Sequence, residues 1–126
     1  MLALWVFVAG GVGSVARWLV SLACQSAFGA TYPIGTLAVN VVGSFLLAAV
    51  VELSVTGGRI SPELRVALAS GFLGGFTTYS AFSHEAFTYL RDGATGLGVG
   101  YLAMTVVACL AACLLGQNAA RAWLGS

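Results

Sequence analysis

Hydrogen-bond donors recur at one-turn spacing in this otherwise apolar sequence. Three pairs of residues four positions apart share one helical face each: Asn40 with Ser44, Ser80 with His84, and Tyr101 with Thr105. Their side chains offer O–H or N–H groups. Inside a membrane, any one of them, Asn40 included, is better explained as an interhelical hydrogen bond. The three pairs together favour a donor-rich path, which suits an anion.

Other chemistry finds little support in the sequence. The run Gly11 to Ala16 matches the dinucleotide fingerprint G-x-G-x-x-A, but no Asp or Glu precedes Glu52 to bind a ribose. His84 adjoins Glu85, yet neighbours on a helix point in different directions and no nucleophile with its base is evident. We therefore expect no enzyme. The chain has three cysteines, Cys24, Cys109 and Cys113, and their spacing is not that of metal ligands. We expect them to pack as small apolar residues.

The composition places these residues in a bilayer. Of 126 residues, 60% are hydrophobic and 7% are charged. Charged residues leave four long uncharged runs, at 1–16, 18–51, 66–84 and 93–120. A helix crosses in about 20 residues, and no period-two alternation indicates a barrel. We predict an all-α integral membrane protein whose single domain, 1–126, contains four transmembrane helices at about 2–28, 33–53, 62–91 and 94–123.

The third predicted helix carries a weak point near its middle. Within Gly71 to His84, GFLGGFTTYSAFSH, paired glycines and paired threonines both disfavour a helix. We expect a break at Gly74, Gly75, Thr77 and Thr78. Freed carbonyls there can bind a cation and freed N–H groups an anion, provided that protein or a water cavity buries them.

Two aromatic residues follow the expected break. Tyr79 and Phe82 are three apart and share a helical face. The edge of an aromatic ring carries partial positive charge, so this face could contact a small anion. Two aromatic rings packed in a core explain the same spacing.

The charges give the helices little orientation. One side of the membrane would carry Arg59, Arg65 and Arg121, the other Arg91 and Arg17, and the chain has no lysine. This bias is too small to decide orientation by the positive-inside rule. Either a weak signal still wins, or both orientations occur and pair as an antiparallel homodimer.

The acidic residues argue against a proton-coupled exporter. Four helices in this length would fit a small multidrug exporter, which needs an acid near the middle of the membrane. Here Glu52, Glu85 and Asp92 all lie toward the ends of the predicted helices.

Over essentially its whole length, the sequence resembles the Fluc family of fluoride channels, also called CrcB proteins. The resemblance is carried by three blocks: GGVGSVARW at 10–18, GTLAVNVVGSFLL at 35–47 and GFLGGFTTYSAFSHE at 71–85. It implies an antiparallel, dual-topology homodimer with two fluoride pores and a structural Na⁺ on the two-fold axis. It also implies a multi-pass protein of a cell membrane, most typical of prokaryotes, with no nucleic-acid partner.

The resemblance further implies roles for individual residues. Backbone carbonyls of Gly74 and Thr77 would hold Na⁺. The fluoride path would be formed by Asn40, Tyr79, Phe82, Ser80, Tyr101, Thr105 and Glu85, with Arg17 at a vestibule. Three residues depart from the family pattern: Tyr79 for a phenylalanine, Ala81 for a hydroxyl residue and Cys109 for a serine. These departures bear on conduction rate and selectivity rather than on fold.

We hypothesise passive, fluoride-selective conduction that lowers cytoplasmic fluoride. Closely spaced donors would replace the water around this small ion, and a narrow bore would exclude chloride. Arg17 would concentrate anions, although a snorkelling arginine explains it nearly as well. Two alternatives remain: a proton-coupled fluoride carrier that uses Glu85 or His84, and a scaffold subunit that binds other membrane proteins.

Overall fold

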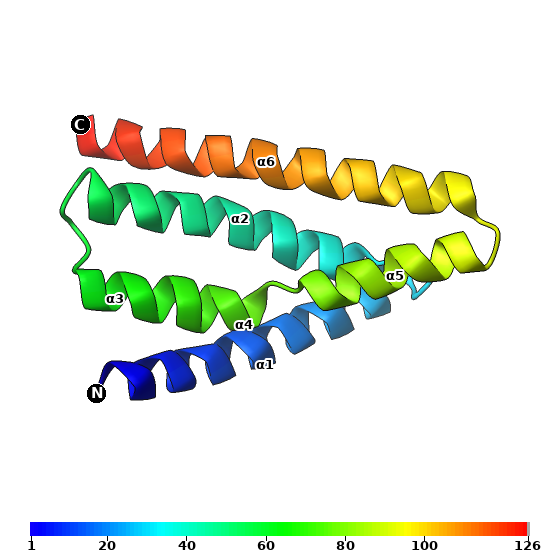
Figure 1. Cartoon of the computed structure of the whole chain (residues 1–126), viewed down its shortest axis with the longest axis horizontal. Helices are drawn as coiled ribbons and strands as arrows, with labels where there is room; N and C mark the ends of the chain where they lie inside the picture. The colour runs from blue at the N-terminus through cyan, green and yellow to red at the C-terminus, as the bar shows by residue number, and fades with distance from the viewer. Residues whose placement is uncertain (126) are drawn as a thin grey trace.

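The chain folds as an all-helical bundle with four passes, the third of them interrupted (Figure 1). The computed structural model describes residues 1–125. Its elements are α1 (Leu2–Phe28), α2 (Ile34–Val55), α3 (Pro62–Val66), η1 (Ala67–Leu73), α4 (Gly74–Phe76), α5 (Tyr79–Arg91) and α6 (Thr95–Gly125). By length and composition α1, α2 and α6 can each cross a membrane. The third pass runs from α3 to α5, so the predicted fold class is confirmed.

Local sequence explains where the third pass begins and how the chain turns. The side chain of Ser61 accepts a hydrogen bond from the amide of Leu64 at 3.2 Å, and Pro62 occupies the first turn of α3. The residues with positive φ are glycines at the connections, Gly29, Gly58 and Gly93. Both termini and the α2–α3 connection lie at the same end of the bundle (Figure 1).

Glycines allow the helices to approach closely. A Cβ atom on Gly13 would collide with the carbonyl of Phe72, and one on Gly75 with the carbonyl of Gly10. These two contacts pack α1 against η1 and α4, as Figure 1 shows. Small residues at such crossings are the usual basis of helix association in membranes.

The break in the third pass falls at Thr77 and Thr78. Their backbones are extended, with φ/ψ of −85°/161° and −150°/115°. Gly74 and Gly75 instead remain helical, as part of α4. The prediction that these glycines would leave the helix is therefore wrong. Gly75 serves close packing against α1, whereas β-branched threonines suit extended backbone. The π-helical segment η1 just before α4 has no signature in the sequence.

A buried ionic cluster joins α2 to α6 near the termini. Glu52 is 5% exposed, and its carboxylate accepts hydrogen bonds from Arg121 Nε and Gln117 Nε2, both at 2.9 Å. The charge of Glu52 is thus paired at the end of its helix and lies outside the cavities described below. This placement agrees with the expectation that the acid lies toward a helix end.

We expect Gly116→Ala to weaken the contact of α6 with α2. The new methyl group would meet the backbone of Phe45, and such overpacking costs about 1–3 kcal/mol. The effect is measured as a change in the midpoint of thermal unfolding in detergent, which is monitored by the loss of monodisperse protein. Gly100→Ala on the same helix is the matched control, because its Cβ has open space. Equal midpoints for the two variants would contradict this account of the crossing.

Candidate functional site

The side chain of Asn40 completes the hydrogen bonding of the broken backbone. Its Oδ1 accepts the amide of Thr78 at 2.8 Å, and its Nδ2 donates to the carbonyl of Thr78 at 3.0 Å. The side-chain amide of Asn40 thus pairs with both backbone groups of Thr78, as a neighbouring strand would in a sheet. Within a bilayer, an unpaired backbone group costs several kcal/mol, on the order of 2–7. Asn40 on α2 therefore stabilises the break in the third pass.

Two backbone carbonyls lose their helical partners at the break. In a continuous helix, the amide of Thr78 would pair with the carbonyl of Gly74, but it donates to Asn40. The amide of Ala81 would pair with the carbonyl of Thr77, but it donates to Thr78 Oγ1 at 3.2 Å. The carbonyls of Gly74 and Thr77 are left free of these two bonds.

A third carbonyl at the break is bound by an arginine. Arg17 on α1 donates from Nε to the carbonyl of Gly75 at 3.1 Å. This contact fixes the guanidinium beside the broken segment, within the membrane-spanning part of α1. The residue therefore does not simply extend to the membrane surface, which was the alternative explanation.

Glu85 on α5 joins three helices. Its Oε1 accepts a hydrogen bond from Thr36 Oγ1 on α2, and its Oε2 accepts one from Tyr101 Oη on α6, each at 2.7 Å. Thr36 is 8% exposed and Tyr101 is fully buried. Short, charge-assisted bonds of this kind are the stronger ones in proteins. They fix the carboxylate in one orientation.

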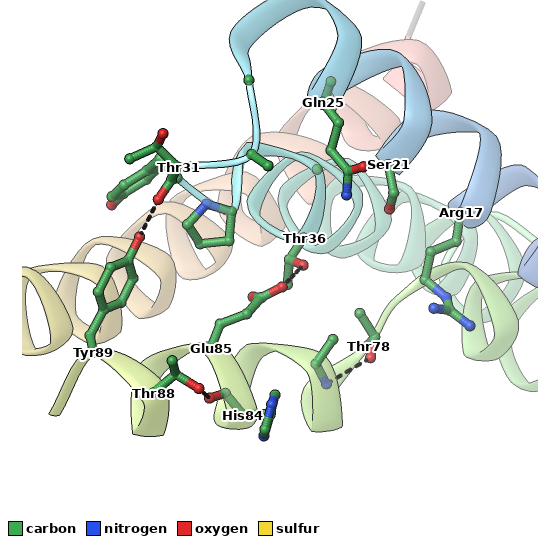
Figure 2. Close-up of a pocket in the computed structure, with 17 residues that line it drawn as sticks. Arg17, Ser21, Gln25, Thr31, Thr36, Thr78, His84, Glu85, Thr88 and Tyr89 are labelled. Atoms are coloured by element: carbon green, nitrogen blue, oxygen red, sulfur yellow. Dashed lines mark hydrogen bonds between the residues drawn. The ribbon is translucent and has the colours of Figure 1, made fainter. Parts of the chain in front are cut away.

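A cavity of about 400 Å³ lies beside the α1–α2 connection, and we call it the loop cavity. Polar side chains from α1, α2 and α5 face it, with Arg17 and Thr78 at one end and Glu85 reaching across toward Thr36 (Figure 2). His84 and Tyr89 line it as well. The loop cavity thus offers a positive charge and several hydroxyl groups.

A second cavity, of about 410 Å³, lies between α2, the third pass and α6, and we call it the central cavity. Its walls are mostly apolar, and its polar side chains come from Asn40, Ser44, Thr77, Thr78, Tyr79, Thr105 and Cys109. Thr105 is 4% exposed, and its Oγ1 has no hydrogen-bond partner among residues 1–125. Thr78 lines both cavities, so the pair of Asn40 and Thr78 stands between them.

The aromatic residues near the break lie in edge contact. The ring centroids of Tyr79 and Phe82 are 5.9 Å apart, and those of Phe82 and Tyr101 are 5.3 Å apart. Phe82 is buried at 7% exposure, whereas Tyr79 is 80% exposed. The two rings share a helical face, as predicted, but Tyr79 lies at the surface of the chain, at the edge of the central cavity.

The structure gathers most, but not all, of the predicted residues around the two cavities. Tyr101 lies behind Glu85 and lines neither cavity. Ser80 is exposed, with its Oγ 3.4 Å from Thr78 Oγ1, and also lines neither. Thr36 was missed, although it lies one helical turn before Asn40 and continues the stripe of Asn40 and Ser44.

Comparisons with known proteins agree with this architecture. The family model described as CrcB-like protein, Camphor Resistance (CrcB), matches residues 4–117. The chain is 45% identical to the fluoride-specific ion channel FluC of Sorangium cellulosum (strain So ce56), with 93% of this chain and 92% of the relative covered. It is 42% identical to that of Citrifermentans bemidjiense, with 94% and 95% covered. It is 44% identical to the fluoride-specific ion channel FluC of Anaeromyxobacter dehalogenans (strain 2CP-1 / ATCC BAA-258), with 96% of this chain and 95% of the relative covered.

We expect Thr36→Val to lower the free energy of unfolding by about 1.5–3 kcal/mol, because the charged Glu85 loses a buried donor. Reversible unfolding in mixed detergent measures the change. Thr88→Val is the matched control, since Thr88 bonds only to the carbonyl of His84 on its own helix. In a Glu85→Ala background, Thr36→Val should cost much less. An undiminished cost there would mean that Thr36 does not act through Glu85.

Proposed function

Because the chain belongs to the CrcB family, we propose that it is a fluoride-specific ion channel through which fluoride leaves the cell passively. The observation that carries this proposal is the arrangement at Thr78. A polar cavity that contains the guanidinium of Arg17 and a central cavity lined by Thr105, whose hydroxyl has no partner among residues 1–125, meet there, at a break in a helix. Passive flow down the electrochemical gradient lowers fluoride in the cytoplasm.

The fluoride path runs from the loop cavity past the break and into the central cavity. Arg17 raises the local anion concentration by its positive charge. Asn40 uses one N–H of its amide on Thr78, so its second N–H is available to the ion. The unpaired hydroxyl of Thr105 is the next donor. Donors at this spacing replace the water around fluoride, and a narrow bore excludes chloride.

The aromatic pair and the remaining polar residues support this path. Ring edges of Tyr79 and Phe82 contact the ion between the stronger donors. Tyr101 donates to Glu85 and acts through it, which keeps the carboxylate near the end of the path in place. The exposed hydroxyl of Ser80 faces outward beside Thr78, where it contributes once a second subunit covers it.

The channel is a homodimer of antiparallel subunits with two pores. The main support is Tyr79, which is 80% exposed at the middle of the third pass. A hydroxyl group there would be costly in lipid, and a partner subunit removes that cost. The near balance of arginines on the two sides fits insertion in both orientations.

The carbonyls of Gly74 and Thr77 from both subunits would hold a structural Na⁺. Their fit rests on the diverted amides of Thr78 and Ala81, which leave these two carbonyls free of their helical bonds. Carbonyl oxygens are suitable ligands for a hard cation. A bound Na⁺ would supply a fixed positive charge that offsets the carbonyl dipoles at the interface.

Two rival functions are a proton-coupled fluoride carrier and a scaffold subunit. The carrier would use Glu85 or His84. Against it, Glu85 accepts hydrogen bonds from Thr36 and Tyr101, each at 2.7 Å, which give the carboxylate a role in joining helices that needs no proton exchange. The scaffold would need a heterologous partner, whereas the two cavities and their donors require none.

We expect purified protein in liposomes to release fluoride rapidly without releasing chloride, with both ions followed by electrodes in parallel samples and Na⁺ present. Asn40→Asp should abolish fluoride release, because a carboxylate lacks the donors of the amide and repels the anion. The dimer should remain intact by size exclusion. Asn118→Asp, the same change at an exposed position on α6, is the matched control.

Three outcomes would contradict this proposal in different ways. Unchanged flux in Asn40→Asp would remove Asn40 from the path. Flux that saturates at low fluoride, moves protons in fixed ratio and disappears in Glu85→Gln would favour the carrier. No release of either ion from a folded dimer would favour the scaffold.

We expect Thr78→Val to raise the Na⁺ concentration that fluoride flux requires. Without Oγ1, the amide of Ala81 can return to the carbonyl of Thr77 and remove an ion ligand. Flux measured over a series of Na⁺ concentrations, with N-methyl-glucamine as the replacement cation, should therefore show a higher Na⁺ requirement. Thr95→Val at the start of α6 makes the same chemical change away from the break. An unaltered Na⁺ requirement in Thr78→Val would argue against these carbonyl ligands.

A further inference from the structure

Cys109 lies in the wall of the central cavity. It is a half-buried, free thiol on α6, one helical turn after Thr105. Thr105 lines the same cavity and is only 4% exposed. Its hydroxyl has no hydrogen-bond partner among the residues described. An unsatisfied buried hydroxyl indicates a place where a guest atom or ion is accommodated. Cys109 and Thr105 therefore border one space that can admit a small molecule.

The other two cysteines have different surroundings. Cys113, one turn further along α6, donates its S–H to the carbonyl of Ser44 at 3.5 Å and lines neither cavity. Cys24 lines the loop cavity, on the other side of the partition formed by Asn40 and Thr78. Each thiol thus has a distinct location, and only Cys109 borders the central cavity.

We propose that Cys109 is a modification site at which small, neutral, thiol-reactive electrophiles close the channel. The blocking part of this inference rests on the proposed conduction of fluoride through the central cavity. The thiolate is the reacting form of cysteine. With a methanethiosulfonate, it attacks the sulfur bound to the organic group, the S–SO₂ bond breaks and methanesulfinate leaves with the electron pair. The thiol proton goes to water, and Cys109 carries a mixed disulfide.

The walls of the cavity determine the class of reagent. They are formed mainly by apolar residues such as Leu47, Leu73 and Val106, so a neutral reagent enters more readily than a charged one. The added group projects from α6 beside Thr105, where it displaces the ion from a donor. A benzyl group should block more completely than a methyl group, because it fills more of a space of about 410 Å³.

The test uses the full-length protein in liposomes and two variants. One, Cys24→Ser with Cys113→Ser, keeps only Cys109, and the other also carries Cys109→Ser. Each is treated with methyl or benzyl methanethiosulfonate. Mass spectrometry measures modification, and an electrode measures fluoride efflux before and after treatment. We expect the variant that keeps Cys109 to gain one adduct and to lose its efflux about tenfold or more, and a thiol reductant to restore it. The variant without cysteine should show the same efflux before and after.

The two readouts separate the failure of this proposal from the failure of the proposed function. Complete modification of Cys109 with unchanged efflux would overturn the block. No adduct on Cys109 in the folded protein, under conditions that modify the same thiol fully after denaturation, would overturn the site itself. If the untreated protein conducts no fluoride, the proposed function fails and the block fails with it. The adduct on Cys109 would then decide only whether the thiol is accessible.

Discussion

The structure depends on a break in a membrane-spanning helix whose backbone groups must be satisfied without water. At Thr77 and Thr78 the chain is extended, and a bilayer offers no solvent to replace the lost helical bonds. Asn40 meets this need with a donor and an acceptor on one amide group. Arg17 covers a further carbonyl, that of Gly75. The break is therefore a built feature, held from two neighbouring helices.

The same break divides the interior into two cavities with different properties. Thr78 lines both, so any path between the loop cavity and the central cavity passes the groups that Asn40 positions. On one side, Arg17 and the fixed carboxylate of Glu85 set the electrostatics. On the other, apolar walls leave the hydroxyl of Thr105 as an isolated donor. The two cavities thus differ in polarity, although Thr78 borders both.

A single chain does not bury everything that this arrangement requires. Tyr79 follows the break with most of its surface exposed, whereas Phe82, three residues later, packs against Tyr101 within the chain. Within one turn of α5, therefore, one aromatic ring is exposed and the other is buried in the chain. The free carbonyls of Gly74 and Thr77 lie at the same level. The segment just after the break therefore combines packing inside the chain with an exposed aromatic surface.

The sequence alone determined the fold class, because uncharged runs of sufficient length must form helices in lipid. It also located the broken pass and the stripe that contains Asn40, since periodicity and helix-breaking residues are local properties. Tertiary structure decided which backbone groups the break frees, because that depends on where Asn40 and Ser/Thr hydroxyls reach. It confined the expected break at Gly74, Gly75, Thr77 and Thr78 to the two threonines, since Gly75 is needed for contact with α1. It also joined Thr36, Glu85 and Tyr101, three residues on different helices that no sequence spacing connects.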